Sequence, residues 1–145
     1  MEDVKTLLAH VRHQLDEAGA EQIPMPDLEA RELTACALGI DRRLLPALGA
    51  RPVTASEREK TEALVARRLS GEPLAYVLGE WDFYGITLRV TPDVLIPRSD
   101  TERLCELAIE RVQTMQNPRV LDLCSGSGCI ALALLHEVPA AQAIA

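Results

Sequence analysis

The residues from Asp122 to Ala131 combine an acid, two glycines and small side chains at the start of an apolar segment. This pattern predicts a buried strand that ends near Asp122, a turn through Gly126 and Gly128, and then a helix. Glycine permits a positive φ and leaves room for a ligand beside the backbone, while the helix directs its first N–H groups toward the same place. The segment is therefore expected to form a cradle for a nucleotide-type ligand.

Two ligand classes fit this cradle. Gly-x-Gly-x-x-Ala at 126–131 satisfies the dinucleotide fingerprint, but the acid expected about 20 residues further on falls past Ala145. Asp122 favours the other class, because a dinucleotide-binding strand normally has an apolar residue there. The pattern resembles motif I of S-adenosylmethionine-dependent methyltransferases, with Cys124 replacing its first glycine, and we expect a negative φ at Cys124. A loop without a ligand is the structural alternative.

Four segments together carry a more specific pattern. They are Gly-Glu-Pro-Leu-Ala-Tyr-Val-Leu-Gly at 71–79, Phe-Tyr-Gly at 83–85, Val-Leu-Ile-Pro-Arg-Ser-Asp-Thr-Glu at 94–102 and Asp-Leu-Cys-Ser-Gly-Ser-Gly at 122–128. In order and spacing they resemble the peptide chain release factor N5-glutamine methyltransferases, and the second predicted helix together with residues 38–42 resembles that family's N-terminal helical domain. Ser99-Asp100 depart from the Pro-Glu that the family more often has.

The resemblance implies an enzyme that uses S-adenosylmethionine to methylate the glutamine of the Gly-Gly-Gln motif in peptide chain release factors. It implies that the cofactor contacts Asp122, Cys124, Ser125, Gly126, Ser127 and Gly128. It also places Phe83, Arg98, Thr101 and Glu102 near the pocket. Their structural alternatives are burial in the hairpin core for Phe83, and a helix cap with an ion pair for the other three.

Two parts of the family's site are not found in the 145 residues. The family orients the glutamine amide with an Asn-Pro-Pro-Tyr motif, and it binds the cofactor's ribose with an acid at the end of its second strand. Residues 143–145 resemble only the start of that second strand. We therefore expect the N-terminal portion of such an enzyme, with no catalytic residue of its own and activity only in the intact, monomeric protein. The alternatives are a non-catalytic release-factor-binding fragment and an NAD-dependent enzyme.

The expected fold is α+β, with a helical release-factor-recognition domain at 1–70. Apolar residues at helical spacing predict a helix over 4–18 with Asp3 as its N-cap, and a short helix is expected after Asp41. Thr54 and Glu57 have the spacing of a capping box before a helix that ends near residue 71. A second helix is expected after an Asp27 cap. Inward-facing positions in these helices are expected to be Leu28, Leu33, Cys36, Ala37, Leu38, Ala63, Leu64 and Leu69.

Residues 71–98 are expected to form a β-hairpin and linker, and 99–145 the start of a Rossmann-like α/β methyltransferase domain. Segments 75–78 and 80–84 read as extended, Gly85 as a turn, and 86–90 as the second strand. All four aromatic residues fall within 76–84, which predicts a local apolar cluster. Ser99 or Asp100 is expected to cap a helix that leads to a strand at 119–123.

Composition limits the remaining possibilities. The net charge of −7 argues against a general nucleic-acid-binding protein, and Arg67-Arg68 is interpreted as a solvated helix end, with a phosphate contact as the alternative. The acidic Met1-Glu2-Asp3 does not fit a signal peptide and no apolar run reaches membrane-spanning length, so we expect a cytoplasmic protein without a membrane partner. Four scattered cysteines and three histidines predict neither disulfides nor a metal site.

Overall fold

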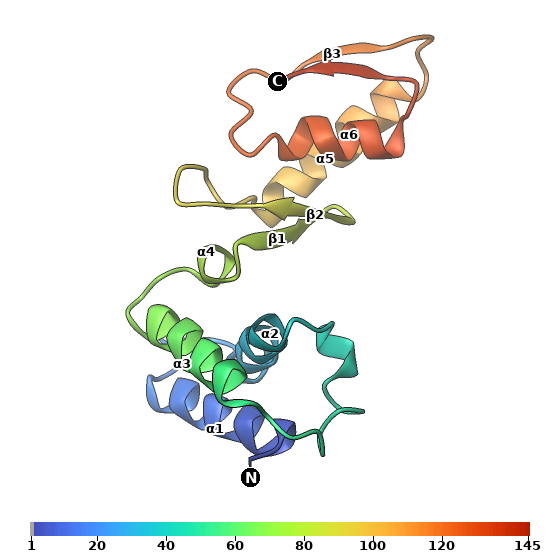
Figure 1. Cartoon of the computed structure of the whole chain (residues 1–145). Helices are drawn as coiled ribbons and strands as arrows, with labels where there is room; N and C mark the ends of the chain where they lie inside the picture. Colours follow the sequence, from blue (N-terminus) through green and yellow to red (C-terminus); the bar gives the residue numbers. More distant parts are fainter. Residues whose placement is uncertain (1) are drawn as a thin grey trace. The chain divides into compact units, whose positions relative to one another are not determined.

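The computed structural model describes residues 2–145. The chain divides into two compact units: unit 1 extends to Leu78, and unit 2 extends from Gly79 to Ala145. Unit 1 is helical, whereas unit 2 combines two helices with two small sheets (Figure 1). The predicted mixture of helix and sheet is confirmed, and the Rossmann-like completion of unit 2 stays a prediction.

Local capping explains where most helices of unit 1 begin and end. Its elements are α1 (Val4–Glu17), α2 (Pro26–Leu38), the 3-10 helix η1 (Arg42–Leu44), α3 (Ala55–Leu69) and α4 (Leu74–Leu78). The Asp3 carboxylate accepts a hydrogen bond from the Thr6 N–H at 2.8 Å. Thr54 and Glu57 form the predicted capping box, and Gly39 ends α2 with a φ of +64°. These bonds satisfy backbone groups that a helix end otherwise leaves unpaired.

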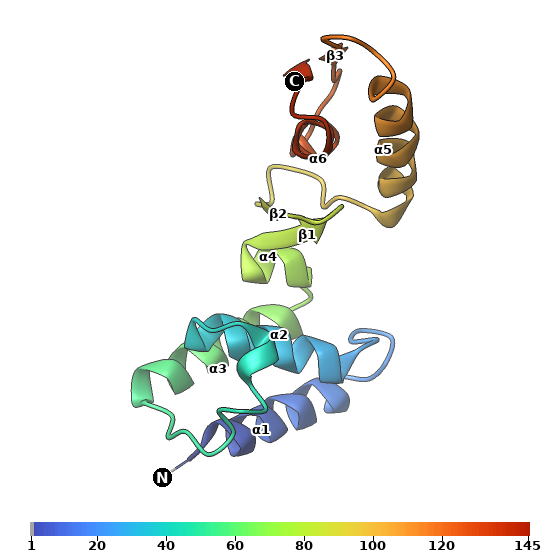
Figure 2. The ribbon, with the colours of Figure 1, turned by 90° about the vertical axis from the view of Figure 1, so that its right-hand side faces the viewer.

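The core of unit 1 lies between α1, α2 and α3. Both ribbon views show α1 and α2 side by side (Figures 1 and 2). The buried side chains of this core are Leu7, Val11, Leu15, Ile23, Ala30, Leu33, Val65 and Val77. Because Val77 belongs to this core, residues 74–78 fold as helix α4 and the expected extended segment at 75–78 is wrong. The carbonyl of Pro73 accepts the N–H groups of Tyr76 and Val77, which starts that helix.

The inward faces of α2 and α3 are rotated from those expected. Helix α2 begins at Pro26, whose fixed φ suits the first helical position, and Met25 is the residue before it, so Asp27 is not the cap. Leu33 and Ala37 are buried as predicted, and Leu38, Leu64 and Leu69 are partly buried beside the core. The remaining expected positions, Leu28, Cys36 and Ala63, are exposed.

A buried ion pair joins α2 to α3. Arg68 donates through Nε to Glu29 Oε2 at 2.6 Å, and both side chains are about one-tenth exposed. Its neighbour Arg67 binds Glu72 at 2.6 Å and donates to the carbonyls of Tyr76 and Val77. The interpretation of Arg67-Arg68 as a solvated helix end is therefore wrong for Arg68, which is buried, whereas Arg67 stays about half exposed while it bonds to α4.

Unit 2 begins with the predicted hairpin. Its elements are β1 (Glu80–Phe83), β2 (Ile86–Arg89), α5 (Ser99–Val112), β3 (Arg119–Leu121), α6 (Cys129–Glu137) and β4 (Gln142–Ile144). Strands β1 and β2 pair antiparallel around Gly85, and β3 and β4 pair parallel. The residue before α5 is Arg98, with no side-chain cap, so Ser99 and Asp100 lie within the first turn and do not cap the helix.

Helices α5 and α6 pack with the hairpin to make the second core. Its buried residues are Phe83, Leu88, Cys105, Ile109, Val112, Cys129, Ala133, Leu134, Val138 and Ala141. Tyr84 packs beside this core, whereas Tyr76 belongs to unit 1, so the four aromatic residues do not share one compact unit. On the parallel pair, Leu121 and Ile144 are 62% and 65% exposed, so this small sheet leaves apolar surface in solvent.

Candidate functional site

The acid of the glycine-rich segment connects the end of a strand to the start of a helix. Asp122 follows β3, and its N–H donates to the carbonyl of Ile144 at 2.8 Å, which extends the pairing with β4. Its Oδ2 accepts from the N–H of Ala131, in the first turn of α6, at 3.3 Å. Within residues 2–145 no donor is bonded to Oδ1. One oxygen of the carboxylate therefore supports the loop while the other is available to a ligand.

Three residues of the turn have left-handed backbone. The φ angles are +62° at Cys124, +57° at Gly126 and +74° at Gly128. The N–H of Gly128 donates to the carbonyl of Ser125 at 2.8 Å, which closes the turn, and the carbonyl of Gly128 accepts from Leu132. The negative φ expected at Cys124 is wrong, because the reversal from β3 into α6 imposes the glycine-like conformation at this position too. A non-glycine residue there costs about 1–2 kcal/mol.

The turn presents backbone donors on an open side. A Cβ added to Gly126 would meet no atom within 4 Å, so the space beside this glycine is free. In the described part of the chain, the N–H groups of Cys129 and Ile130 have no acceptor, as is usual in the first turn of a helix. Such groups favour ligand atoms that carry lone pairs, and the Asp122 carboxylate favours hydroxyl or cationic groups. Together they fit a polar ligand with both kinds of group.

Glu102 belongs to the first turn of α5 and contacts the hairpin. Its Oε1 accepts from the N–H of Tyr84 at 3.1 Å, which ties α5 to the hairpin turn. One turn of helix further on, Cys105 is fully buried. Burial raises the pKa of the Cys105 thiol to about 11, and the charges of Cys129, Glu102 and Asp122 add to this rise. Because burial and these negative charges both disfavour the thiolate, the Cys105 thiol stays protonated at neutral pH.

The other expected near-site residues have different surroundings. Phe83 is 2% exposed in the core of unit 2. The N–H of Thr101 donates to the carbonyl of Arg98 at 3.0 Å, in the first turn of α5. Across residues 2–145 the Arg98 side chain forms no ion pair. Two hydrogen bonds of the site were not predicted: the one from the Tyr84 N–H to Glu102 and the one from the Ala131 N–H to Asp122. An acid near the first turn of a helix is the sequence signal that could have indicated them, because free backbone N–H groups lie there.

Within 2–145, no three His, Cys, Asp or Glu side chains lie close enough together to hold a metal ion. No helix in this range combines the length and the apolar character needed to cross a membrane.

Known proteins match this chain over most of its length. The model of the PrmC N-terminal domain matches residues 6–79. A release factor glutamine methyltransferase from Burkholderia pseudomallei is 44% identical over 119 residues, which are 82% of this chain and 42% of that protein. The one from Bordetella pertussis is 46% identical over 83% of this chain and 45% of its own length. The human MTRF1L release factor glutamine methyltransferase is 39% identical over 81% of this chain and 38% of its length. The chain thus spans less than half the length of these relatives.

Proposed function

Because this chain belongs to the family of the PrmC N-terminal domain, we propose that the complete protein is a release factor glutamine methyltransferase. The observation that carries the proposal is the set of relatives with that name, which are 38–46% identical over most of this chain. The matches continue beyond the N-terminal domain into unit 2, because one of them covers 141 residues. The proposed substrate is the glutamine side chain of the Gly-Gly-Gln motif in peptide chain release factors.

We propose that the loop from Asp122 to Cys129 contributes to binding S-adenosylmethionine. The residues present fit this cofactor, because Asp122 has one oxygen available for its positively charged end and the backbone beside Gly126 is open. The proposed contacts are Asp122, Cys124, Ser125, Gly126, Ser127 and Gly128. When bound, S-adenosylmethionine supplies an electrophilic methyl group. The role of this chain is to hold that group in place and to keep its charge beside a carboxylate.

The glutamine must be oriented by other residues. An amide nitrogen is a weak nucleophile because its lone pair is delocalised into the carbonyl, so catalysis depends on positioning and on hydrogen bonds that improve in the transition state. The Asn-Pro-Pro-Tyr motif that performs this task in the family does not occur in the 145 residues. We therefore expect the 145-residue polypeptide alone to leave release factors unmethylated, and we assign it no catalytic residue.

Recognition of the release factor is proposed for unit 1. The second candidate function is release-factor binding without catalysis, which needs only that unit 1 fold by itself, and unit 1 has its own core around Leu7, Leu15 and Leu33. The two proposals differ in the product of the reaction, because only the first changes the mass of the release factor. They therefore separate in a single assay.

The test is to incubate the complete protein with S-adenosylmethionine and a purified release factor, and to map methylation by peptide mass spectrometry. A release factor with asparagine in place of the Gly-Gly-Gln glutamine is the control. We expect one added methyl group on the glutamine and none on the control. Binding without any methylation would favour the second function, and methylation of the control to the same extent would contradict the proposed substrate.

A further inference from the structure

Two adjoining hollows form one groove between α1 and α2 in unit 1. Their volumes are about 190 and 280 Å³, and Lys5, Leu8 and Arg31 line both of them. The side-by-side helices are visible in two views (Figures 1 and 2). Leu8, Ala30 and Leu45 contribute the apolar lining, which extends toward Pro46 in the loop after η1. The groove therefore offers aliphatic surface along its length.

The charged lining residues of this groove are predominantly basic. Among the described residues that line it, four are basic and one, Asp27, is acidic. At one end Arg12 binds Asp27 at 3.0 Å, and Arg42 is paired with Glu32. Between these pairs, Lys5 on α1 and Arg31 on α2 are exposed, and neither forms an ion pair with a carboxylate of the described chain. The middle of the groove thus keeps two positive charges, one from each helix.

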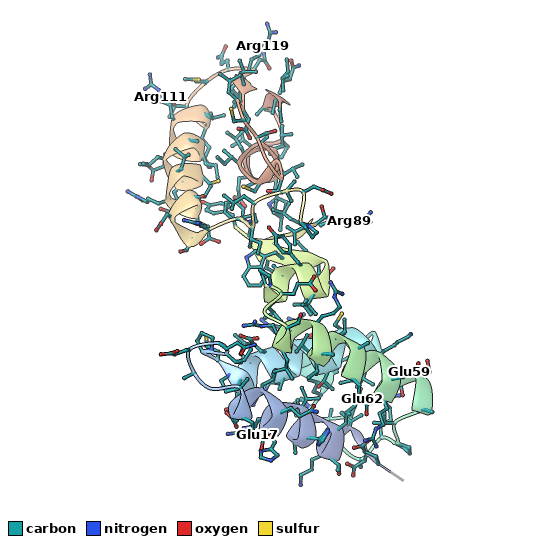
Figure 3. The ribbon with its side chains drawn as sticks, turned by 90° about the vertical axis from the view of Figure 1, so that its left-hand side faces the viewer. Glu17, Glu59, Glu62, Arg89, Arg111 and Arg119 are labelled. Atoms are coloured by element: carbon teal, nitrogen blue, oxygen red, sulfur yellow. The ribbon has the colours of Figure 1, made fainter. Side chains whose placement is uncertain are left out.

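The position of these charges contrasts with the rest of the protein. The whole chain has a net charge of −7. On α3, the labelled Glu59 and Glu62 are exposed, and Glu62 accepts a hydrogen bond from Arg58 (Figure 3). Within this acidic chain, the groove combines positive charge with an apolar lining, and it complements a ligand that is acidic and partly apolar.

We propose that this groove is the docking site for an acidic segment of the release factor, with an aliphatic side chain of that segment seated on Leu8 and its carboxylates beside Lys5 and Arg31. This inference rests on the proposed function for the identity of the partner. A protein segment fits better than a nucleic acid, because none of the groove's lining residues is an aromatic platform for a base.

The test reverses one charge at a time in the complete protein. Lys5→Glu and Arg31→Glu each remove a positive charge from the groove, and Lys60→Glu makes the same change at an exposed position of α3 outside it. Neither groove side chain makes a hydrogen bond within residues 2–145, and an acid at position 5 lies in the first turn of α1, where the helix dipole favours it. Thermal unfolding of each variant checks that the fold is kept.

Affinity for the release factor is measured by titration at low and at physiological salt. We expect each groove variant to raise Kd by about tenfold at low salt, with a smaller ratio at higher salt, because these charges are exposed and screened. The Kd of Lys60→Glu for the release factor is expected to stay within about twofold of that of the unchanged protein. Methylation of the release factor is measured in parallel.

The outcomes separate the two proposals. Groove variants that bind as tightly as Lys60→Glu would overturn the docking site, while methylation by the unchanged protein would leave the proposed function standing. An unchanged protein that neither binds nor methylates the release factor would overturn both. A 20-nucleotide single-stranded RNA serves as a second probe. If the unchanged protein binds this RNA tightly and both Lys5→Glu and Arg31→Glu lose that binding, the groove binds a nucleic acid and the proposed acidic protein segment is wrong.

Discussion

Replacing Glu29 with glutamine should destabilise unit 1 by about 3 kcal/mol. The variant keeps the size of the side chain and removes the charge that balances Arg68. Both side chains are about one-tenth exposed, and the two groups share hydrogen bonds of 2.6 and 3.3 Å. Removing one partner of a buried pair typically costs about 3–5 kcal/mol, because a charge is left in a place that excludes water.

The lower end of that range applies for a structural reason. Arg68 also donates to the carbonyl of Gln22 at 2.9 Å and to that of Glu72 at 3.4 Å. These two bonds remain in Glu29→Gln, so the guanidinium keeps part of its coordination. A loss of about 3 kcal/mol is still a large share of the roughly 5–15 kcal/mol that stabilises a typical domain.

Urea unfolding of the 145-residue chain, followed by circular dichroism at 222 nm, measures this effect. Glu62→Gln is the control, because Glu62 and its partner Arg58 are about half exposed and such pairs contribute less than about 1 kcal/mol. The double variant Glu29→Leu/Arg68→Met should recover most of the lost stability, since it leaves no unpaired charge. A loss for Glu29→Gln no larger than that for Glu62→Gln would refute the reasoning.

Three further predictions concern unit 2. Cys124→Gly should raise its free energy of unfolding by about 0.5–1 kcal/mol, because relief of the left-handed strain exceeds the entropy that glycine loses on folding; a lower melting temperature would contradict this. The pKa of Cys105 is raised from its ordinary 9.0 to about 11, so the unfolded thiol ionises first and stability should fall between pH 9 and 11 in urea unfolding. Cys105→Ser should reduce this fall, and the remainder includes Tyr84, whose pKa burial also raises. Limited proteolysis should cut first within 90–98, which is free of helix and strand. Cleavage inside α5 before cleavage within 90–98 would contradict the assignment of residues 90–98 as the exposed loop.

The sequence predicts those parts of the fold that are determined over a few residues. Asp3 and Thr54 each accept from the N–H three positions ahead, and Glu57 accepts from the N–H of Thr54, so their spacing alone locates the starts of α1 and α3. Gly85, between two alternating segments, is enough to predict the hairpin of β1 and β2. The acid, glycine turn and helix at 122–131 are predicted for the same reason.

Features that depend on distant residues were not predicted. Arg68 is buried because Glu29 lies opposite it, and the two are 39 positions apart in the chain. Residues 74–78 are helical because Val77 reaches the core of unit 1, although their aromatic and β-branched side chains favour an extended segment. The positive φ of Cys124 follows from the closure of the turn by Gly128, which side-chain preference alone does not reveal.

Calorimetric titration of the complete protein with S-adenosylmethionine tests the proposed site most directly. Asp122→Asn keeps an acceptor for the Ala131 N–H and removes only the charge, so we expect Kd to rise by about tenfold or more. Gly126→Val should also abolish tight binding, since its φ of +57° strains a β-branched residue. Asp82→Asn, on the exposed side of β1, is the control and should bind normally, and NAD should not compete. Normal affinity in both Asp122→Asn and Gly126→Val would contradict the assignment of this loop to the cofactor.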